Sequence, residues 1–156
     1  MTIYAKDVMD TSFHKIHQDA PLDYAINLVL NGKVRKTGHK TVSIIVVDDF
    51  GQLAGVISMY DILYHLRPDF LNLANISADK LLWKGQLSRL VEALKEKTAK
   101  QVMSRNVMCA SIDDHIMVIL DLMIKNKYRR LPVLEQNKPI GVIYLSDVYN
   151  SIFKLA

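Results

Sequence analysis

Two seven-residue segments of this chain have the residue types and spacing to bind a sugar phosphate. Residues 55–61 read GVISMYD and residues 141–147 read GVIYLSD, so an aspartate follows a glycine at the same interval in both. Each segment begins as an apolar strand and is expected to continue into a helix, where free backbone N–H groups and the positive end of the helix dipole attract an anion. Ser58, at the start of the first helix, can add a hydroxyl to a phosphate site. Asp61 and Asp147, in the first helical turn, can accept hydrogen bonds from the two hydroxyls of a ribose, each contributing about 1.5–3 kcal/mol.

A purely structural interpretation of these residues competes with ligand binding. Serine and aspartate at a helix start are also preferred N-cap residues. Their recurrence at the same point of two segments favours a ligand. Tyr144 stands in the second segment where Ser58 stands in the first, and its bulk can narrow or fill a second cleft. The Ser58/Asp61 site is therefore expected to be the better one, and the Asp147 site weaker or altered.

These segments belong to a repeat that spans nearly the whole chain. Residues 5–9 (AKDVM) return as residues 99–103 (AKQVM), and the apolar helical pattern of residues 22–29 returns over residues 116–123. One repeat is too small to bury a core alone. Two copies are expected to pack together about a pseudo-two-fold axis, with a ligand cleft between them.

Each repeat is expected to fold as strand, helix, strand, strand, helix, which is an α/β pattern of the α+β kind. In the first repeat the expected elements are a strand over residues 13–16, a helix starting at residues 19–21 with Asp19 as N-cap, strands over 42–47 and 53–57, and a helix over 59–66 that Pro68 ends. In the second repeat they are a cap at Asp113 or Asp114, strands near residues 131–134 and 140–144, and a last helix from about Ser146.

Two segments fall outside the repeat. Residues 31–41 contain two glycines and several cationic side chains, which is typical of a loop. Residues 68–98 carry four apolar residues at helical spacing, Leu87, Leu90, Val91 and Leu94. This spacing predicts a linker helix that packs on the body of the protein or on a second subunit. The expected organisation is a first repeat over residues 1–67, a helical linker over 68–98 and a second repeat over 99–156.

The duplicated pattern resembles the cystathionine-beta-synthase (CBS) domain family, in the tandem arrangement called a Bateman module. The resemblance rests on the Val-Met pairs at residues 8–9 and 102–103, on residues 129–133 (RRLPV), and on the Gly-to-Asp ending of both repeats. It implies tandem β-α-β-β-α units in a pseudo-two-fold pair. It also implies clefts that bind AMP, ADP, ATP or S-adenosylmethionine.

The resemblance implies roles for individual residues. Asp61 would bind the ribose and Ser58 the phosphate of a nucleotide, and Asp147 holds the ribose position of a second cleft. Arg129 and Arg130 match family residues that often reach the phosphates.

The first repeat lacks such an arginine pair. Its nearest cations are His39 and Lys40, which either substitute for the arginines or remain solvated. The residues that can form an apolar slot for adenine, and that fit an ordinary core equally well, are Phe13, Ile16, Ile44, Val107 and Ala110.

Composition narrows the classes of function. Among 156 residues, 20 Lys and Arg against 16 Asp and Glu give a net charge of +4, which suits a nucleotide better than a nucleic-acid duplex. No apolar run approaches the ~20 residues that cross a bilayer, and the opening residues lack a secretory signal, so a cytoplasmic protein is expected. The single cysteine, Cys109, excludes an internal disulfide and is expected to be a buried thiol in a strand.

Catalysis is not expected, because the sequence contains no nucleophile elbow, P-loop or metal-ligand spacing. His14 and His17 fall in a predicted strand, which points them to opposite faces and argues against a shared metal. The leading hypothesis is a homodimeric sensor of adenine nucleotides that regulates a partner protein, without membrane, metal or catalytic cofactor. One alternative is a structural dimerisation module with empty clefts, whose linker helix binds a partner. Another is nucleic-acid binding through the loop at residues 33–40.

Overall fold

The computed structural model describes residues 2–32, 43–68 and 85–154. The described residues form two compact units. Unit 1 contains residues 2–13, 47–53 and 106–154, and unit 2 contains residues 14–32, 43–46, 54–68 and 85–105. The predicted phosphate contacts His39 and Lys40 lie outside the described residues.

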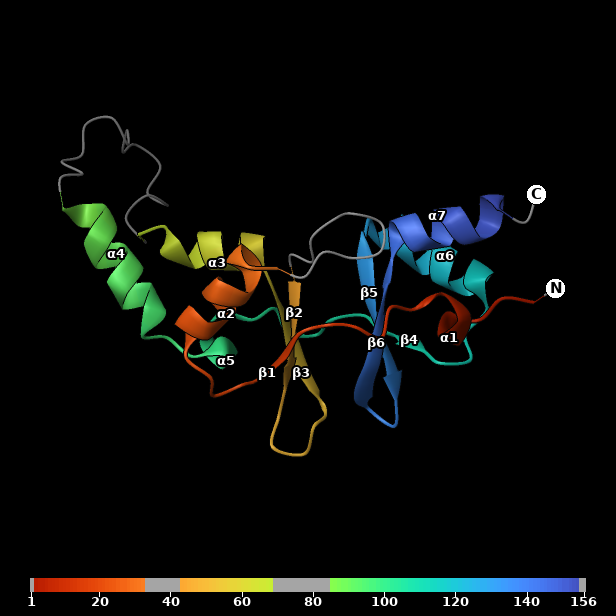
Figure 1. Cartoon of the computed structure of the whole chain (residues 1–156), viewed down its shortest axis with the longest axis horizontal. Helices are drawn as coiled ribbons and strands as arrows, with labels where there is room; N and C mark the ends of the chain where they lie inside the picture. Colours follow the sequence, from red (N-terminus) through yellow and green to blue (C-terminus); the bar gives the residue numbers. More distant parts are fainter. Residues whose placement is uncertain (1, 33–42, 69–84, 155–156) are drawn as a thin grey trace. The chain divides into compact units, whose positions relative to one another are not determined.

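Unit 2 is built on a three-stranded sheet in the order β1-β2-β3. Its strands are β1 (Lys15–His17), β2 (Ser43–Val47) and β3 (Leu53–Ser58), and its helices are α2 (Leu22–Leu30), α3 (Met59–Leu66), α4 (Gln86–Lys95) and α5 (Ala99–Val102). The helices lie on one face of this sheet (Figure 1). The β-branched, apolar sequence of β2 suits a strand whose middle residues are buried.

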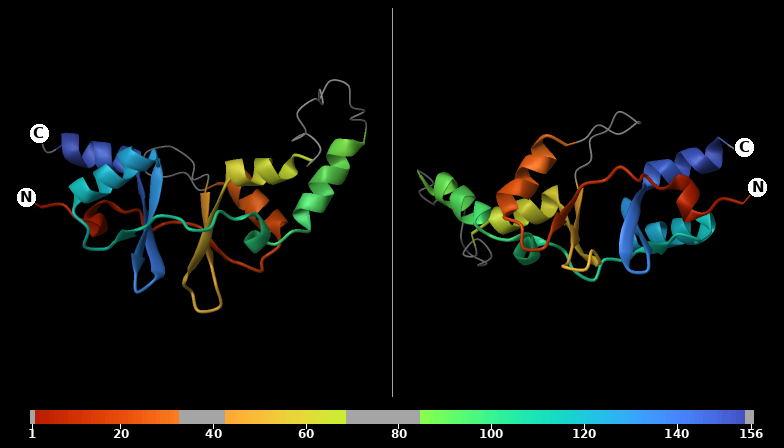
Figure 2. Two further views of the ribbon diagram at one scale, coloured as in Figure 1. Left: turned by 180° about the vertical axis from the view of Figure 1, so that it is seen from behind. Right: turned by 60° about the horizontal axis from the view of Figure 1, so that its bottom comes forward.

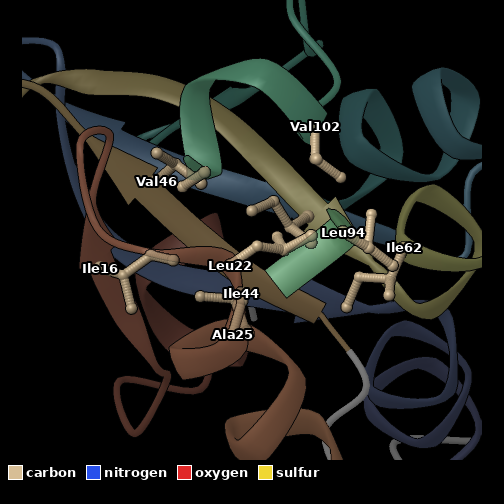
Figure 3. Close-up of a cluster of buried hydrophobic side chains, with 10 residues drawn as sticks. Ile16, Leu22, Ala25, Ile44, Val46, Ile62, Leu94 and Val102 are labelled. Atoms are coloured by element: carbon tan, nitrogen blue, oxygen red, sulfur yellow. The ribbon is translucent and has the colours of Figure 1, made fainter. Parts of the chain in front are cut away.

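The core of unit 2 draws on every one of these elements. Figure 3 shows side chains from the strands and helices meeting, including Leu94 from α4. Its buried members are Ile16, Leu22, Ala25, Ile44, Val46, Ile57, Ile62, Leu94, Ala99 and Val102. The predicted linker helix is therefore confirmed as α4, and it packs against α2 and α3 of its own chain.

Unit 1 has the same plan. Its strands β4 (Ala110–Ser111), β5 (Arg130–Glu135) and β6 (Lys138–Tyr144) form a sheet in which β4 and β5 are parallel and β5 and β6 antiparallel. Helices α1 (Ala5–Val8), α6 (Ile116–Asn126) and α7 (Leu145–Phe153) cover one face of it (Figure 2). The fully buried side chains of this core include Ile119, Met123, Leu131, Val133, Ile143 and Val148.

The opening segment of each repeat packs in the unit built mainly from the other repeat. In unit 1, the N–H of Asp10 donates to the carbonyl of Val142 (2.9 Å), and the N–H of Val142 donates to the carbonyl of Asp10 (3.0 Å). In unit 2, Ser104 and Val56 exchange the same pair of bonds, at 2.9 and 3.1 Å. The last strand of each repeat therefore forms one antiparallel bridge with the opening segment of the other repeat.

This exchange explains the glycine of each Gly-Val-Ile motif. A Cβ atom on Gly55 would lie 2.6 Å from the carbonyl oxygen of Ser104 and 2.7 Å from the sulfur of Met103. A Cβ atom on Gly141 would lie 2.7 Å from the sulfur of Met9. The Val-Met and Gly-Val-Ile motifs of the sequence thus meet in space, each pairing with the motif of the other repeat.

The predicted helix caps are wrong. Pro21, not Asp19, is the N-cap of α2, and the N–H of Leu22 donates to the carbonyl of Lys97 (2.7 Å). His115, rather than Asp113 or Asp114, is the N-cap of α6, and its Nδ1 accepts from the N–H of Met117 (3.1 Å). The exchanged segments supply backbone acceptors at these helix starts, so acidic caps are not needed.

None of the helices in the described part of the chain combines the length and apolar character that a bilayer crossing requires. Cys109 directly precedes β4 and is half-buried, and its Sγ lies 3.4 Å from the carbonyl oxygen of Val107. Burial raises the pKa of the Cys109 thiol above its ordinary value. The sulfur is therefore held in the unreactive thiol form near neutral pH.

Candidate nucleotide site

The candidate site in unit 2 lies where β3 ends and α3 begins. Ser58 is the N-cap of α3, and its Oγ accepts from the N–H of Asp61 (3.2 Å). The backbone N–H and the hydroxyl of Ser58 both donate to Oδ2 of Asp61, at 2.8 and 2.9 Å. The two residues therefore form a capping box, which the competing structural interpretation anticipates. In this arrangement the hydroxyl of Ser58 already donates its hydrogen to Asp61. It would have to break this bond before it could donate to a phosphate.

The other oxygen of Asp61 has a different partner. The hydroxyl of Ser104 donates to Oδ1 of Asp61 (2.8 Å), and the Ser104 side chain is exposed. Because water can replace an exposed hydroxyl at little cost, a ligand hydroxyl can do so as well. A carboxylate offers about four acceptor positions, and the hydrogen bonds from Ser58 and Ser104 to Asp61 use three of them. Asp61 is thus fixed through Oδ2 and open to exchange through Oδ1.

Sequence reasoning did not single out Ser104. Ser104 directly follows the repeated Val-Met pair at residues 102–103, and this adjacency was the available signal. Its contact with Asp61 depends on the exchange of opening segments, which the sequence pattern does not show.

The corresponding place in unit 1 is the junction of β6 and α7. The N–H of Tyr144, at the N-cap of α7, donates to Oδ2 of Asp147 (3.3 Å). Asp10 takes the backbone position that Ser104 takes in unit 2, since it pairs with Val142 as Ser104 pairs with Val56. Oδ1 of Asp10 accepts from the N–H of Ser12 (2.8 Å). The strand that leads to Asp61 therefore pairs with Ser104, whereas the strand that leads to Asp147 pairs with Asp10.

The predicted phosphate contacts of the second repeat differ in environment. Arg129 is exposed, whereas Arg130 begins β5 and stands opposite Tyr144 in the sheet register. Nη1 of Arg130 is buried and has no hydrogen-bond partner among the described residues. A buried guanidinium N–H without an acceptor is unfavourable, and an anionic ligand would supply the missing acceptor.

His14 shows the same feature in unit 2. Its Nε2 is buried without a hydrogen-bond partner in the described part of the chain. Its carbonyl accepts from the N–H of Ile45 (3.0 Å), which fixes the backbone beside β2. In the sequence, His14 was considered only with His17, as a pair whose opposite faces argue against a shared metal.

The residues predicted to form an adenine slot are mostly core. Ile16 and Ile44 belong to the buried cluster of unit 2, and Ala110 belongs to that of unit 1. Phe13 and Val107, both in unit 1, are half-buried. Their role in binding adenine stays a prediction.

A separate cavity of about 290 Å³ lies at the other end of α3, against α4. No residue predicted for the nucleotide site lines it. Its walls are Tyr64, His65, Leu66, Arg67, Pro68, Leu90, Ala93, Leu94 and Lys97.

The duplicated strand-helix-strand-strand-helix unit, with an aspartate in the first turn of each last helix, defines a tandem-repeat α+β module. The family model of the CBS domain matches residues 5–68 and 99–154, and the chain belongs to this family. The resemblance proposed from the sequence is thereby confirmed.

Known relatives share this fold. The chain is similar to CBSX2 of Arabidopsis thaliana in complex with AMP, at 21% identity and a TM-score of 0.69, covering 97% of both chains. It is also similar to the cytosolic domain of the Mg²⁺ channel MgtE in complex with ATP, at 18% identity and a TM-score of 0.65, covering 95% of this chain and 48% of that one. A curated relative, inosine-5'-monophosphate dehydrogenase of Methanocaldococcus jannaschii, is 40% identical over 63 residues. This match covers 38% of the chain and 13% of the relative's length.

Proposed function

We propose that this protein is a regulatory module that binds an adenosine nucleotide, and that Asp61 holds the ribose. The observation that carries the proposal is the state of the Asp61 carboxylate. Ser58 fixes Oδ2 through two hydrogen bonds, while Oδ1 accepts one bond from the exposed hydroxyl of Ser104. The carboxylate is thus already oriented by Ser58, and the hydroxyl bound to its Oδ1 can be replaced by a hydroxyl of a ligand. Such a carboxylate suits a ligand that presents hydroxyl donors.

Two further facts support a nucleotide as the ligand. Within the described part of the chain, the buried Nη1 of Arg130 has no acceptor, and a phosphate oxygen would provide one. Two proteins of the same fold have structures with AMP and with ATP. AMP, ADP, ATP and S-adenosylmethionine are therefore the ligands to test.

Binding regulates only as far as the ligand prefers one conformation of the module over another. The nucleotide is bound without chemical change, and its occupancy biases the conformation that a partner protein recognises. The proposal includes a partner protein that this module regulates and a location in the cytoplasm.

A thermal-shift titration of the full chain tests the proposal. A nucleotide at 100 times its Kd is expected to stabilise the protein by about 2.7 kcal/mol, seen as a rise in Tm. Asp61→Ala is expected to remove this ligand-dependent rise, whatever its effect on the unliganded Tm. Asp23→Ala is the matched control, because Asp23 is an exposed aspartate in the first turn of α2. A rise that survives in Asp61→Ala contradicts the site, and no rise with any of the four ligands contradicts the function.

A structural dimerisation module is the second candidate, favoured by an exposed aromatic face on α3. Tyr60 is 75% exposed and stacks on Tyr64 with ring centroids 6.3 Å apart, and Leu63 is exposed on the same helix. A second copy of this chain is the proposed occupant of this face. Exposed aromatic groups of this kind are typical of interfaces.

Sedimentation of the wild type and of Tyr60→Ser/Tyr64→Ser tests self-association through α3. The wild type is expected to sediment as a dimer and the double variant as a monomer at the same concentration. Tyr24→Ser, at an exposed tyrosine on α2, is expected to remain dimeric. A monomeric wild type, or a double variant that remains dimeric, contradicts this interface.

A further inference from the structure

The two repeats differ at the residue that directly follows the Val-Met pair. Ser104 and Asp10 follow the Val-Met pair of the second and first repeats, and both pair by two backbone bonds with the strand that leads to an aspartate. Val56 precedes Asp61 by the same interval as Val142 precedes Asp147. Ser104 and Asp10 are therefore structurally equivalent positions in the two units.

The chemistry of this position differs sharply between the units. The Ser104 hydroxyl donates a hydrogen bond to Oδ1 of Asp61 at 2.8 Å and carries no charge. An ionised Asp10 cannot donate a hydrogen bond, and its charge has the same sign as that of Asp147. Unit 2 thus has a hydroxyl donor where unit 1 has a second carboxylate.

We propose that Ser104 is a positioning residue that makes the Asp61 site selective for a vicinal diol, and that Asp10 withholds this selectivity from the Asp147 site. The inference rests on the proposed function. It assigns to each repeat the feature of the ligand that the repeat recognises. Ser104 holds Oδ1 of Asp61 in place, and its hydroxyl yields to the hydroxyls of a ribose. Because Ser104 is neutral and exposed, this exchange leaves no buried group unpaired.

At Asp147 the same ligand would encounter different charged groups than at Asp61. Among the described residues Nη1 of Arg130 is buried without a hydrogen-bond partner that a phosphate would supply, while Asp10 places a negative charge at the backbone position where unit 2 has the neutral Ser104. The second repeat therefore recognises anionic groups with little preference between ribose and deoxyribose. The two repeats would thus respond to different features of one ligand.

Calorimetric titration of the full chain with AMP and with 2′-deoxy-AMP tests this division. The wild type is expected to bind AMP at least tenfold more tightly than 2′-deoxy-AMP at its stronger site, because one hydroxyl bond to a carboxylate is lost. Ser104→Asp is expected to weaken AMP binding at least tenfold and to reduce the preference to less than threefold. Ser104→Ala, which removes the hydroxyl that orients Oδ1 of Asp61 without adding charge, is expected to reduce the preference to a value between those of the wild type and Ser104→Asp. A purely structural role of Ser104 would change stability and leave the preference intact.

Asp10→Ser is the reciprocal variant and does not depend on whether Ser104→Asp folds. Asp10→Ser is expected to raise the preference for AMP over 2′-deoxy-AMP at the weaker site by at least fivefold. A further Asp147→Asn substitution is expected to remove this gain. If the wild type binds AMP and both variants keep the wild-type preferences, the inference is overturned and the proposed function stands. If the wild type binds none of AMP, ADP, ATP and S-adenosylmethionine, the proposed function fails and the inference fails with it.

Discussion

Replacing Leu94 by alanine is expected to lower the free energy of unfolding by about 2–5 kcal/mol, the largest single effect foreseen here. Leu94 is only 4% exposed and packs in the core of unit 2 with side chains of the strands and of the other helices (Figure 3). Truncation leaves a cavity among groups that cannot fully relax. Urea unfolding followed by circular dichroism measures the change.

The same helix supplies the control for this prediction. Leu87 lies two turns earlier on α4 and is 61% exposed, so Leu87→Ala is expected to change the free energy of unfolding by less than about 0.5 kcal/mol. Leu87 and Leu94 lie on the same face of α4, so a large cost for both variants would mean that the C-terminal end of the helix, where Leu94 lies, has no special place in the core. Equal and small costs would mean that α4 is dispensable for the stability of unit 2.

Gly55→Ala is expected to destabilise the protein by about 1–3 kcal/mol, and by more than Gly141→Ala. The new methyl group on residue 55 would meet the backbone carbonyl of Ser104, which is held in place by its bonds to Val56. At residue 141 the nearest atoms to the methyl group would be Sδ, Cγ and Cβ of Met9, of which Sδ and Cγ can rotate away. Thermal and urea unfolding of the two variants give the comparison.

Double-mutant cycles identify the cause of this difference. Combining Gly141→Ala with Met9→Ala is expected to cost less than the sum of the two single changes, because Met9→Ala removes the two closest contacts, those of Sδ and Cγ. Combining Gly55→Ala with Met103→Ala is expected to stay close to additive, because the carbonyl of Ser104 remains. Equal costs for the two glycine variants would contradict the assigned contacts.

The elements that the sequence predicted well are those defined by local patterns. β2 and β3 follow from apolar runs with a turn between them, and α3 ends where Pro68 prevents its continuation. The linker helix follows from apolar residues at helical spacing, although Leu87 of that set is exposed. These elements can be predicted because each depends only on residues that are close together in the sequence.

The features that the sequence did not predict depend on partners far along the chain. The N-terminus of α2 uses the carbonyl of Lys97, so the prediction of an Asp19 cap failed. Ser104 reaches Asp61 across 43 residues, and the repeat pattern shows only that residue 104 follows a Val-Met pair. The pairing of Ser58 with Asp61 was recognisable, because a serine and an acidic residue three positions apart form a capping box locally.

The Val-Met segments that each repeat places in the other unit carry an implication for the origin of this architecture. An ancestor with only one repeat could have satisfied the backbone at its glycine motif by lending its first ten or so residues to an identical molecule. Gene duplication and fusion would then have joined two mutually dependent subunits into one polypeptide. The two halves now differ at the lent position, which is Asp10 in the first repeat and Ser104 in the second.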